Sequence, residues 1–285
     1  EDYLYYYRES PSKGLYRSKL DGSGTVKLTD GFVSNINVVG DTLYYVKDEF
    51  VSKTSEEIKD LYRFQLYCAD LNGSNEKKLI EDCTTVYVTG DCIYYLYEID
   101  YIAYRYDNKP IPNNYHYLYR YDLKTQKNEL LVDRQLDTYR ISGNELYYTV
   151  SDSNRIYHTA LMNAAKEKPD VVYRPEEDEA DNTCTLQFAI LPGKRLLIGD
   201  METLFLYDIQ TAKKEMLTKD YPGLRMMTTD AEVYSYEDDS LVKKFDLNTK
   251  KTEDIHLEKN SATPYLYVFQ NQCYFHNGLD APKVI

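Results

Sequence analysis

The sequence has no tryptophan, only five cysteines and no long apolar segment. No apolar run approaches the ~18–20 residues of a membrane-spanning helix, so we expect no membrane insertion. The chain lacks a CxxC pair and any Cys/His spacing typical of a metal site, so we expect neither a metal nor a cofactor. A Cys83–Cys92 disulfide is one alternative, but we favour free thiols because each cysteine lies in or beside a strand pattern.

Signatures of common catalytic and nucleotide-binding sites are also missing. The chain contains no HExxH, no GxSxG elbow, no Walker A loop and no glycine-rich dinucleotide fingerprint. The formal net charge is −13, whereas binding to a phosphate backbone needs clustered Lys and Arg. We therefore expect no nucleic-acid partner, and no motif predicts an enzyme.

The sequence is instead rich in tyrosine, with 32 Tyr and 8 Phe, and tyrosine is enriched in β-strands. Four strand-like phrases follow one another repeatedly; one series is LYRSKLDG (15–22), TVKLT (25–29), SNINVVG (34–40) and TLYYVK (42–47). The fourth phrase returns about every 40–50 residues, which is the period of propeller blades. It is centred on Leu43, Ile93, Leu146, Leu196, Val233 and Cys273.

Turn residues separate these phrases. Asp21-Gly22 and Asn72-Gly73 supply the positive φ of tight hairpins, and Gly40-Asp41 does the same between the third and fourth phrases. The apolar pattern inside each phrase has a period near two rather than 3.6. The sequence therefore predicts an all-β fold, a β-propeller of four-stranded antiparallel blades.

The stretch LYRSKLDGSGTVKLTDGFVSNINVVGDTLYYV (15–46) resembles bacterial propeller repeats of unknown function that are related to the YWTD propellers of low-density-lipoprotein receptors. The resemblance covers nearly the whole chain and is strongest at 15–47, 65–98 and 117–150. LYYV or LYYL stands where the receptors have YWTD, the tetrad itself is absent, and 155–200 fit the repeat loosely. The resemblance implies a propeller with an extracytoplasmic or cell-surface location and offers no catalytic residues.

By analogy with propellers, the third phrase is the innermost strand and the second phrase the outermost. Six units would close into six blades within a single domain, 1–285. The last blade would pair 264–269 and 272–276 with 15–20 and 25–29, which removes open edges. The strand Tyr3–Arg8 is left over, so seven blades with one incomplete is the alternative.

Three insertions are expected to decorate one face of the propeller, where function tends to reside on loops. They are Asp48–Leu61, Glu98–His116 and Arg174–Thr183. Exposed tyrosine beside amide groups suits sugar faces or peptides, so the second insertion is the predicted binding surface. Its candidate residues are Tyr101, Tyr104, Arg105, Tyr106, Asn113, Asn114 and Tyr115. The structural alternative is that this segment only extends a two-stranded hairpin.

Some carboxylates lie close together in the sequence. The run Glu176–Asp181 lacks the spacing of a Ca²⁺ loop and is interpreted as a solvated loop. Asp200 with Glu202, and Asp238 with Asp239, are close carboxylates like the acidic pair of a glycosidase, but such pairs also arise by chance among 47 acidic residues.

We therefore expect a monomeric, non-enzymatic propeller that presents a loop-elaborated face to an unknown protein, peptide or glycan. The alternative is a carbohydrate-active enzyme that uses acidic residues near the central channel. A third hypothesis is a scaffold domain that spaces or multimerises other domains of a longer parent.

Overall fold

The computed structural model describes residues 3–52, 61–97, 116–151, 153–175, 186–199, 203–219, 226–238, 241–257, 265–269, 272–276 and 283–284. Almost all regular structure in these ranges is antiparallel strand, and the one helix among them is the 3₁₀ turn Leu161–Asn163. The predicted fold class, an all-β propeller, is confirmed. Contacts divide the chain into two compact units, Glu1–Leu136 and Asp137–Ile285. The single-domain assignment of 1–285 stays a prediction.

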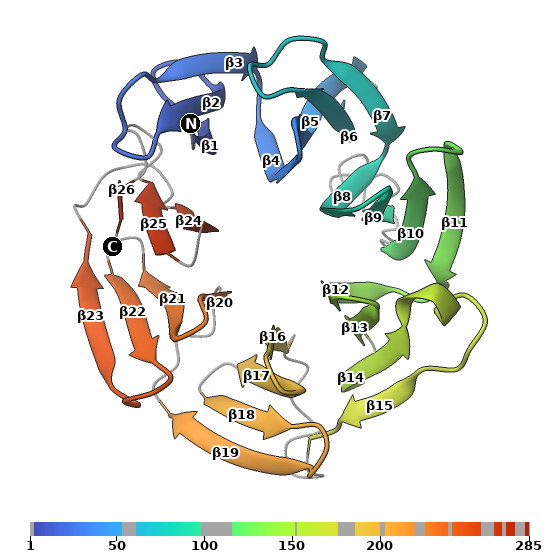
Figure 1. The fold of residues 1–285 in the computed structure, drawn as a ribbon, viewed down its shortest axis with the longest axis vertical. Helices are drawn as coiled ribbons and strands as arrows, with labels where there is room; N and C mark the ends of the chain where they lie inside the picture. The colour runs from blue at the N-terminus through green and yellow to red at the C-terminus, as the bar shows by residue number, and fades with distance from the viewer. Residues whose placement is uncertain are drawn as a thin grey trace, which may run out of the picture. The chain divides into compact units, whose positions relative to one another are not determined.

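Unit 1 contains three sheets, whose strands follow one another in chain order across each sheet. The first sheet is β1 (Tyr3–Arg8), β2 (Gly14–Lys19) and β3 (Val26–Asp30). The second is β4 (Val33–Val39), β5 (Thr42–Ser52), β6 (Leu61–Asp70) and β7 (Lys77–Glu81). The third is β8 (Cys83–Thr89), β9 (Cys92–Tyr97), β10 (Tyr117–Asp122) and β11 (Lys127–Val132). Within this unit, β4 and β8 lie side by side on the concave side (Figure 1).

Unit 2 repeats the same arrangement in four further sheets. They are β12 (Leu136–Ser142), β13 (Glu145–Val150), β14 (Ser153–Ala160) and β15 (Asp170–Tyr173); β16 (Gln187–Leu191), β17 (Arg195–Gly199), β18 (Leu204–Asp208) and β19 (Lys213–Thr218); β20 (Met226–Thr228), β21 (Glu232–Asp238), β22 (Leu241–Asp246) and β23 (Thr252–His256); and β24 (Tyr265–Phe269), β25 (Gln272–His276) and β26 (Lys283–Val284). Strand β20 lies beside both β16 and β24 on the concave side of the unit (Figure 1).

The order of the four phrases within a sheet is as predicted. In every four-stranded sheet the third phrase forms the first strand, followed by the fourth, first and second phrases. The region that fits the repeat loosely, 155–200, supplies regular strands to two of these sheets. Short hairpins and the period of two therefore determine the strand order even where the sequence match is weak.

The strands at the two ends of the chain lie in two different sheets of three strands. Tyr3–Arg8 pairs with β2 along its whole length, and β3 pairs with the other edge of β2. Gln272–His276 pairs with β24 and β26. The expected ladder between 272–276 and 15–20 is therefore a wrong prediction, because β1 already holds that edge. The described strands form five four-stranded sheets and two three-stranded sheets.

Directly opposite tyrosines on adjacent strands pack against each other in four sheets. Their rings are stacked, with centroids 5.4–6.1 Å apart. The pairs are Tyr6–Tyr16, Tyr45–Tyr67, Tyr95–Tyr119 and Tyr148–Tyr157. Aromatic cross-strand pairs stabilise antiparallel sheets, so the repeated YY phrase is a packing signal. The hydroxyls of Tyr45 and Tyr95 donate to side chains, those of Glu76 and Asn128.

The turns have the backbone conformations and hydrogen bonds that are typical of their residues. Gly22 and Gly73 have φ of 81° and 85°, which confirms the positive φ expected at both hairpins. A second turn type follows the third strand in the sheets that read DLKT, DIQT and DLNT. There the Asp carboxylate accepts the amide of the Thr three residues later, as Asp122 does from Thr125 at 2.7 Å. These hydrogen bonds lower the pKa of Asp122, Asp208 and Asp246.

Candidate functional site

The seven residues predicted to bind a ligand lie outside the described residues. They are Tyr101, Tyr104, Arg105, Tyr106, Asn113, Asn114 and Tyr115. The structure does describe the base of the segment that carries them, where Tyr97 of β9 pairs with Tyr117 of β10. Their role as a binding surface therefore stays a prediction, and so does the hairpin alternative for the same segment.

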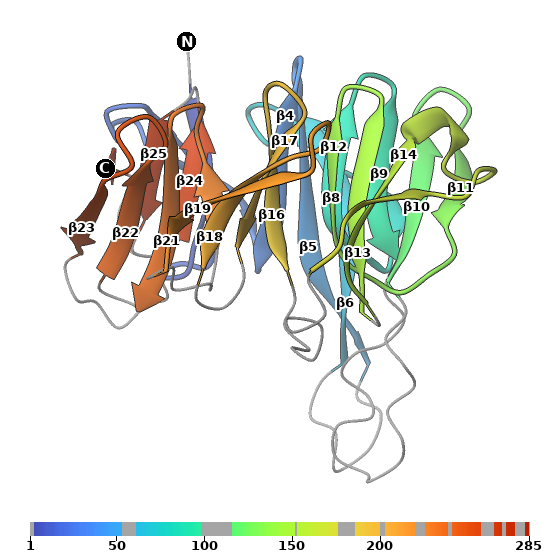
Figure 2. The same ribbon diagram turned by 90° about the horizontal axis from the view of Figure 1, so that it is seen from below.

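The predicted insertion 48–61 is partly strand. The β5–β6 ladder continues from Asp48 opposite Phe64 to Ser52 opposite Leu61, which corrects the expected loop start at Asp48. Strand β4 pairs with β5 only as far as Lys47, so the continuation is a two-stranded projection beyond its own sheet. Figure 2 shows β5 and β6 extending further than β9 and β10 of the same unit.

Ion pairs hold the base of this projection. Lys78 of β7 lies 3.3 Å from Glu49 and 3.2 Å from Glu81, and these two carboxylates raise the pKa of the lysine. Arg63 of β6 lies 3.5 Å from Asp82, between the second and third sheets. Partly exposed ion pairs contribute little energy each, so their effect is to orient the projection rather than to stabilise the fold.

Most of the carboxylates that the sequence singled out are outside the described residues, namely Glu176–Asp181, Asp200, Glu202 and Asp239. Asp238 is described and ends β21, opposite Leu241. In the part of the chain that the structure describes, no group of three or more His, Cys, Asp or Glu side chains is arranged to hold a metal ion. The histidine with a carboxylate partner there is His158, whose Nε2 lies 2.5 Å from Glu145 Oε2.

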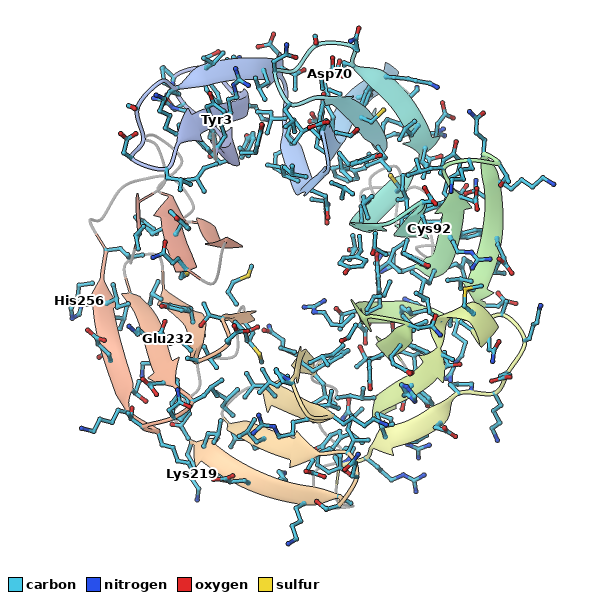
Figure 3. The ribbon with its side chains drawn as sticks, viewed as in Figure 1. Tyr3, Asp70, Cys92, Lys219, Glu232 and His256 are labelled. Atoms are coloured by element: carbon cyan, nitrogen blue, oxygen red, sulfur yellow. The ribbon has the colours of Figure 1, made fainter. Side chains whose placement is uncertain are left out.

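Four of the five cysteines are described, and all four are free thiols, as favoured. Cys83 and Cys273 are buried, and burial raises the pKa of each thiol to about 12. Such thiols are protonated at neutral pH and do not act as nucleophiles. Cys92, labelled in Figure 3 at the start of β9, is partly exposed.

The inner strands of unit 1 carry a feature that the sequence reading missed. β4 and β8 each contain a β-bulge, between Ser34 and Asn37 and between Thr84 and Tyr87. The second residue of each bulge is left-handed: Asn35 has φ of 49° and Thr85 has φ of 47°. A β-branched residue in this conformation is uncommon, and strained bulges recur beside functional sites. The adjacent polar residues Ser34-Asn35 and Thr84-Thr85 were the available signal.

Two asparagines of β4 hold the bulge of β8. The Asn35 side chain accepts the Val86 amide at 3.2 Å, and Asn37 Nδ2 lies 3.4 Å from the Val86 carbonyl. Asn37 also donates to the Asn35 carbonyl at 2.8 Å. The backbone groups that a bulge leaves outside its ladder are thus paired by the neighbouring sheet. These asparagines position the inner strands of unit 1.

The inner strands of unit 2 carry one arginine among the described residues of β12, β16, β20 and β24, and this is Arg140 of β12. Its Nη1 donates to Thr138 Oγ1 at 2.9 Å and to the Tyr139 carbonyl at 2.8 Å. Its guanidinium carbon lies 5.9 Å from the ring centroid of buried Phe188 on β16. Arg140 is exposed to solvent although three contacts fix it.

No protein-family model matches the chain. No curated protein matches it either. Solved structures do resemble it. TolB from Acinetobacter baumannii superposes with a TM-score of 0.59 and 13% identity over 90% of this chain, which spans 64% of TolB. Nidogen in its laminin complex gives 0.55 and 12%, over 89% of this chain and 92% of that one. An oligogalacturonate lyase from Vibrio parahaemolyticus gives 0.62 and 12%, over 99% and 85%.

Identities this low establish the fold alone. The likeness to nidogen agrees with the resemblance to YWTD-type propellers at the level of the fold. These structural relatives include a protein in a complex with a partner and an enzyme. No helix in the described ranges has the length and apolar character to cross a membrane.

Proposed function

We propose that the protein is a non-enzymatic binding propeller that presents the face with the β5–β6 projection and the segment 98–116 to a protein, peptide or glycan. The observation that supports this proposal is the length of the β5–β6 projection. Strands β5 and β6 have 11 and 10 residues, whereas β9 and β10 have 6 each. The part of β5 and β6 that extends beyond the neighbouring strand β4 does not enlarge the packed sheet, but it places the connecting loop away from the rigid scaffold. Nidogen in its laminin complex is an example of this fold in a protein complex.

The test compares the full chain with a variant in which 99–115 are replaced by Asn-Gly. Both are applied to a glycan array and to a displayed peptide library, and both are melted. We expect binding by the full chain, loss of that binding in the variant, and a melting temperature within about 2 °C of the full chain. A variant in which Asp21–Ser23, a short turn, is replaced by Asn-Gly serves as the control and keeps the binding. Retained binding after replacement of 99–115 contradicts the assignment of the surface.

A carbohydrate-active enzyme is the second candidate, which the fold-level likeness to an oligogalacturonate lyase supports. The same full chain is incubated with a panel of neutral and acidic polysaccharides, and products are followed by mass spectrometry. Turnover that falls at least a hundredfold in an Asp200→Asn or Glu202→Gln variant favours this candidate. Binding without turnover across the panel favours the first.

The location outside the cytoplasm or on the cell surface is likewise our proposal, supported by the resemblance to YWTD-type propellers. Fractionation of cells that make the full-length gene product tests it, with the protein expected in the extracytoplasmic fraction. We also propose a monomer, and light scattering after size-exclusion chromatography is expected to give a mass near 33.5 kDa for this chain.

A further inference from the structure

Arg140 is a charged side chain on an inner strand that has no carboxylate partner among the described residues. Among the other described arginines, Arg63 pairs with Asp82 and Arg120 with Glu129, whereas Arg195 donates to a backbone carbonyl. The nearest acid in sequence, Asp137, accepts the Ser151 hydroxyl at 2.7 Å.

The guanidinium is fixed in one orientation. Nη1 donates to Thr138 Oγ1 at 2.9 Å and to the Tyr139 carbonyl at 2.8 Å, and the guanidinium carbon lies 5.9 Å from the ring centroid of Phe188. A guanidinium has five N–H donors, and those of Nε and Nη2 make no hydrogen bond with another described residue. That edge has the fork geometry that matches a planar carboxylate with two parallel hydrogen bonds.

We propose that Arg140, oriented by Thr138 and Phe188, binds the carboxylate of a small acidic ligand. The acidic chain repels polyanions, so a ligand with a single carboxylate is favoured over a nucleic acid or a highly sulfated glycan. Neighbouring protein atoms desolvate the guanidinium enough to lower the pKa of Arg140, although part of the side chain is exposed to solvent. Thr138, Arg140 and Phe188 all lie outside the segment 99–115 in the sequence.

The test uses D-glucuronate and D-glucose, which differ in the carboxylate. Isothermal titration calorimetry on the full chain is expected to detect glucuronate and not glucose. Arg140→Gln should weaken glucuronate at least tenfold, and Arg140→Lys, which keeps the charge but loses the fork, at least threefold. Arg195→Gln is the matched control, because Arg195 is also exposed and donates to a carbonyl, that of Pro192 at 3.1 Å. It should bind glucuronate as the native chain does.

A second readout follows the arginine Nε–H signals by ¹⁵N-edited NMR, where the signal missing from Arg140→Gln should be the one that glucuronate shifts. No binding of glucuronate by the native chain, or equal binding by Arg140→Gln, overturns the proposal. Inorganic phosphate bound as tightly as glucuronate, by both the native chain and Arg140→Lys, overturns the carboxylate fork. Replacement of 99–115 should leave glucuronate binding unchanged, so failure of the face proposed above and failure of this site are distinguishable.

Discussion

Sheets β4–β7 and β16–β19 place different side chains at equivalent positions of the repeat. In β4–β7, Tyr45 lies opposite Tyr67, and its buried hydroxyl donates to Glu76, the residue before the outer strand β7. The carboxylate also lies 3.3 Å from Lys47. A buried hydroxyl needs a partner, and this sheet supplies a charged one.

In β16–β19 the same positions hold Ile198 and Phe205, which have no hydroxyl. The residue equivalent to Glu76 is Lys214, and its ammonium lies 4.2 Å from the ring centroid of Phe205. The residue at this outer position therefore differs with the core. It is a hydrogen-bond acceptor, Glu76, where the core residue has a hydroxyl, and a cation, Lys214, where the core residue is a phenylalanine. The comparison teaches that both sheets keep a buried aromatic ring on the third strand, Tyr67 or Phe205, and differ in the polar partner on the outer strand.

The substitutions with the largest expected effect on the free energy of unfolding remove a buried ring from each sheet. Tyr45→Ala and Phe205→Ala should each lower the free energy of unfolding by about 3–5 kcal/mol, because both rings are fully buried and leave a cavity. Urea denaturation followed by circular dichroism measures this. Met162→Ala, at a side chain that is 62% exposed, is the control and should change little. A cost near zero for either ring variant contradicts the shared packing role.

Removing only the hydroxyl should separate a charged acceptor from a neutral one. Tyr45→Phe should cost about 1.5–3 kcal/mol, because it leaves the Glu76 carboxylate without this donor. Tyr95→Phe, whose hydroxyl donates to Asn128 at 3.1 Å, should cost about 0.5–1.5 kcal/mol. The same denaturation experiment decides, and equal costs would remove the distinction.

The charge on Glu76 should make its contribution depend on pH. Burial raises the pKa of Glu76, but hydrogen bonds from Tyr45 and Lys47 outweigh burial and leave the pKa lowered. A lowered pKa stabilises the folded state above the unfolded value of about 4.3, and this stabilisation is lost as the pH falls through the folded pKa. Glu76→Gln should therefore cost about 1 kcal/mol at pH 7, after allowance for solvent screening. Thermal melts from pH 7 to pH 3 should show the difference shrinking below about pH 4, and a constant difference would contradict the assignment.

The smallest expected effect belongs to the cation in β16–β19. Lys214→Met keeps the aliphatic length but loses the charge over Phe205, which is expected to cost about 0.5–1 kcal/mol. The matched control is Lys213→Met, one residue away on the same strand and exposed. Equal effects of the two substitutions would show that the ring contact contributes nothing specific.

Much of the fold was predictable because its signals are local. The YY phrase predicted the stacked pairs, Gly22 and Gly73 predicted the left-handed turns, and the strand order followed from short hairpins. The pairing partner of Tyr3–Arg8 could not be predicted from its sequence. A strand-like phrase does not specify which neighbouring strand it pairs with, and here that strand is β2. The inner-strand arginine was overlooked because one Arg in a strand phrase has no sequence signature.

By itself the sequence determined the strands, their antiparallel order, the turn conformations and the burial of tyrosine, since each depends on residues close together in the chain. Only the tertiary structure decided that β1 takes the edge of β2, that Asn35 and Asn37 pair with the bulge of β8, and that Phe188 lies beneath Arg140. These contacts join residues about 10–50 positions apart, and their geometry depends on how whole sheets pack rather than on any local preference.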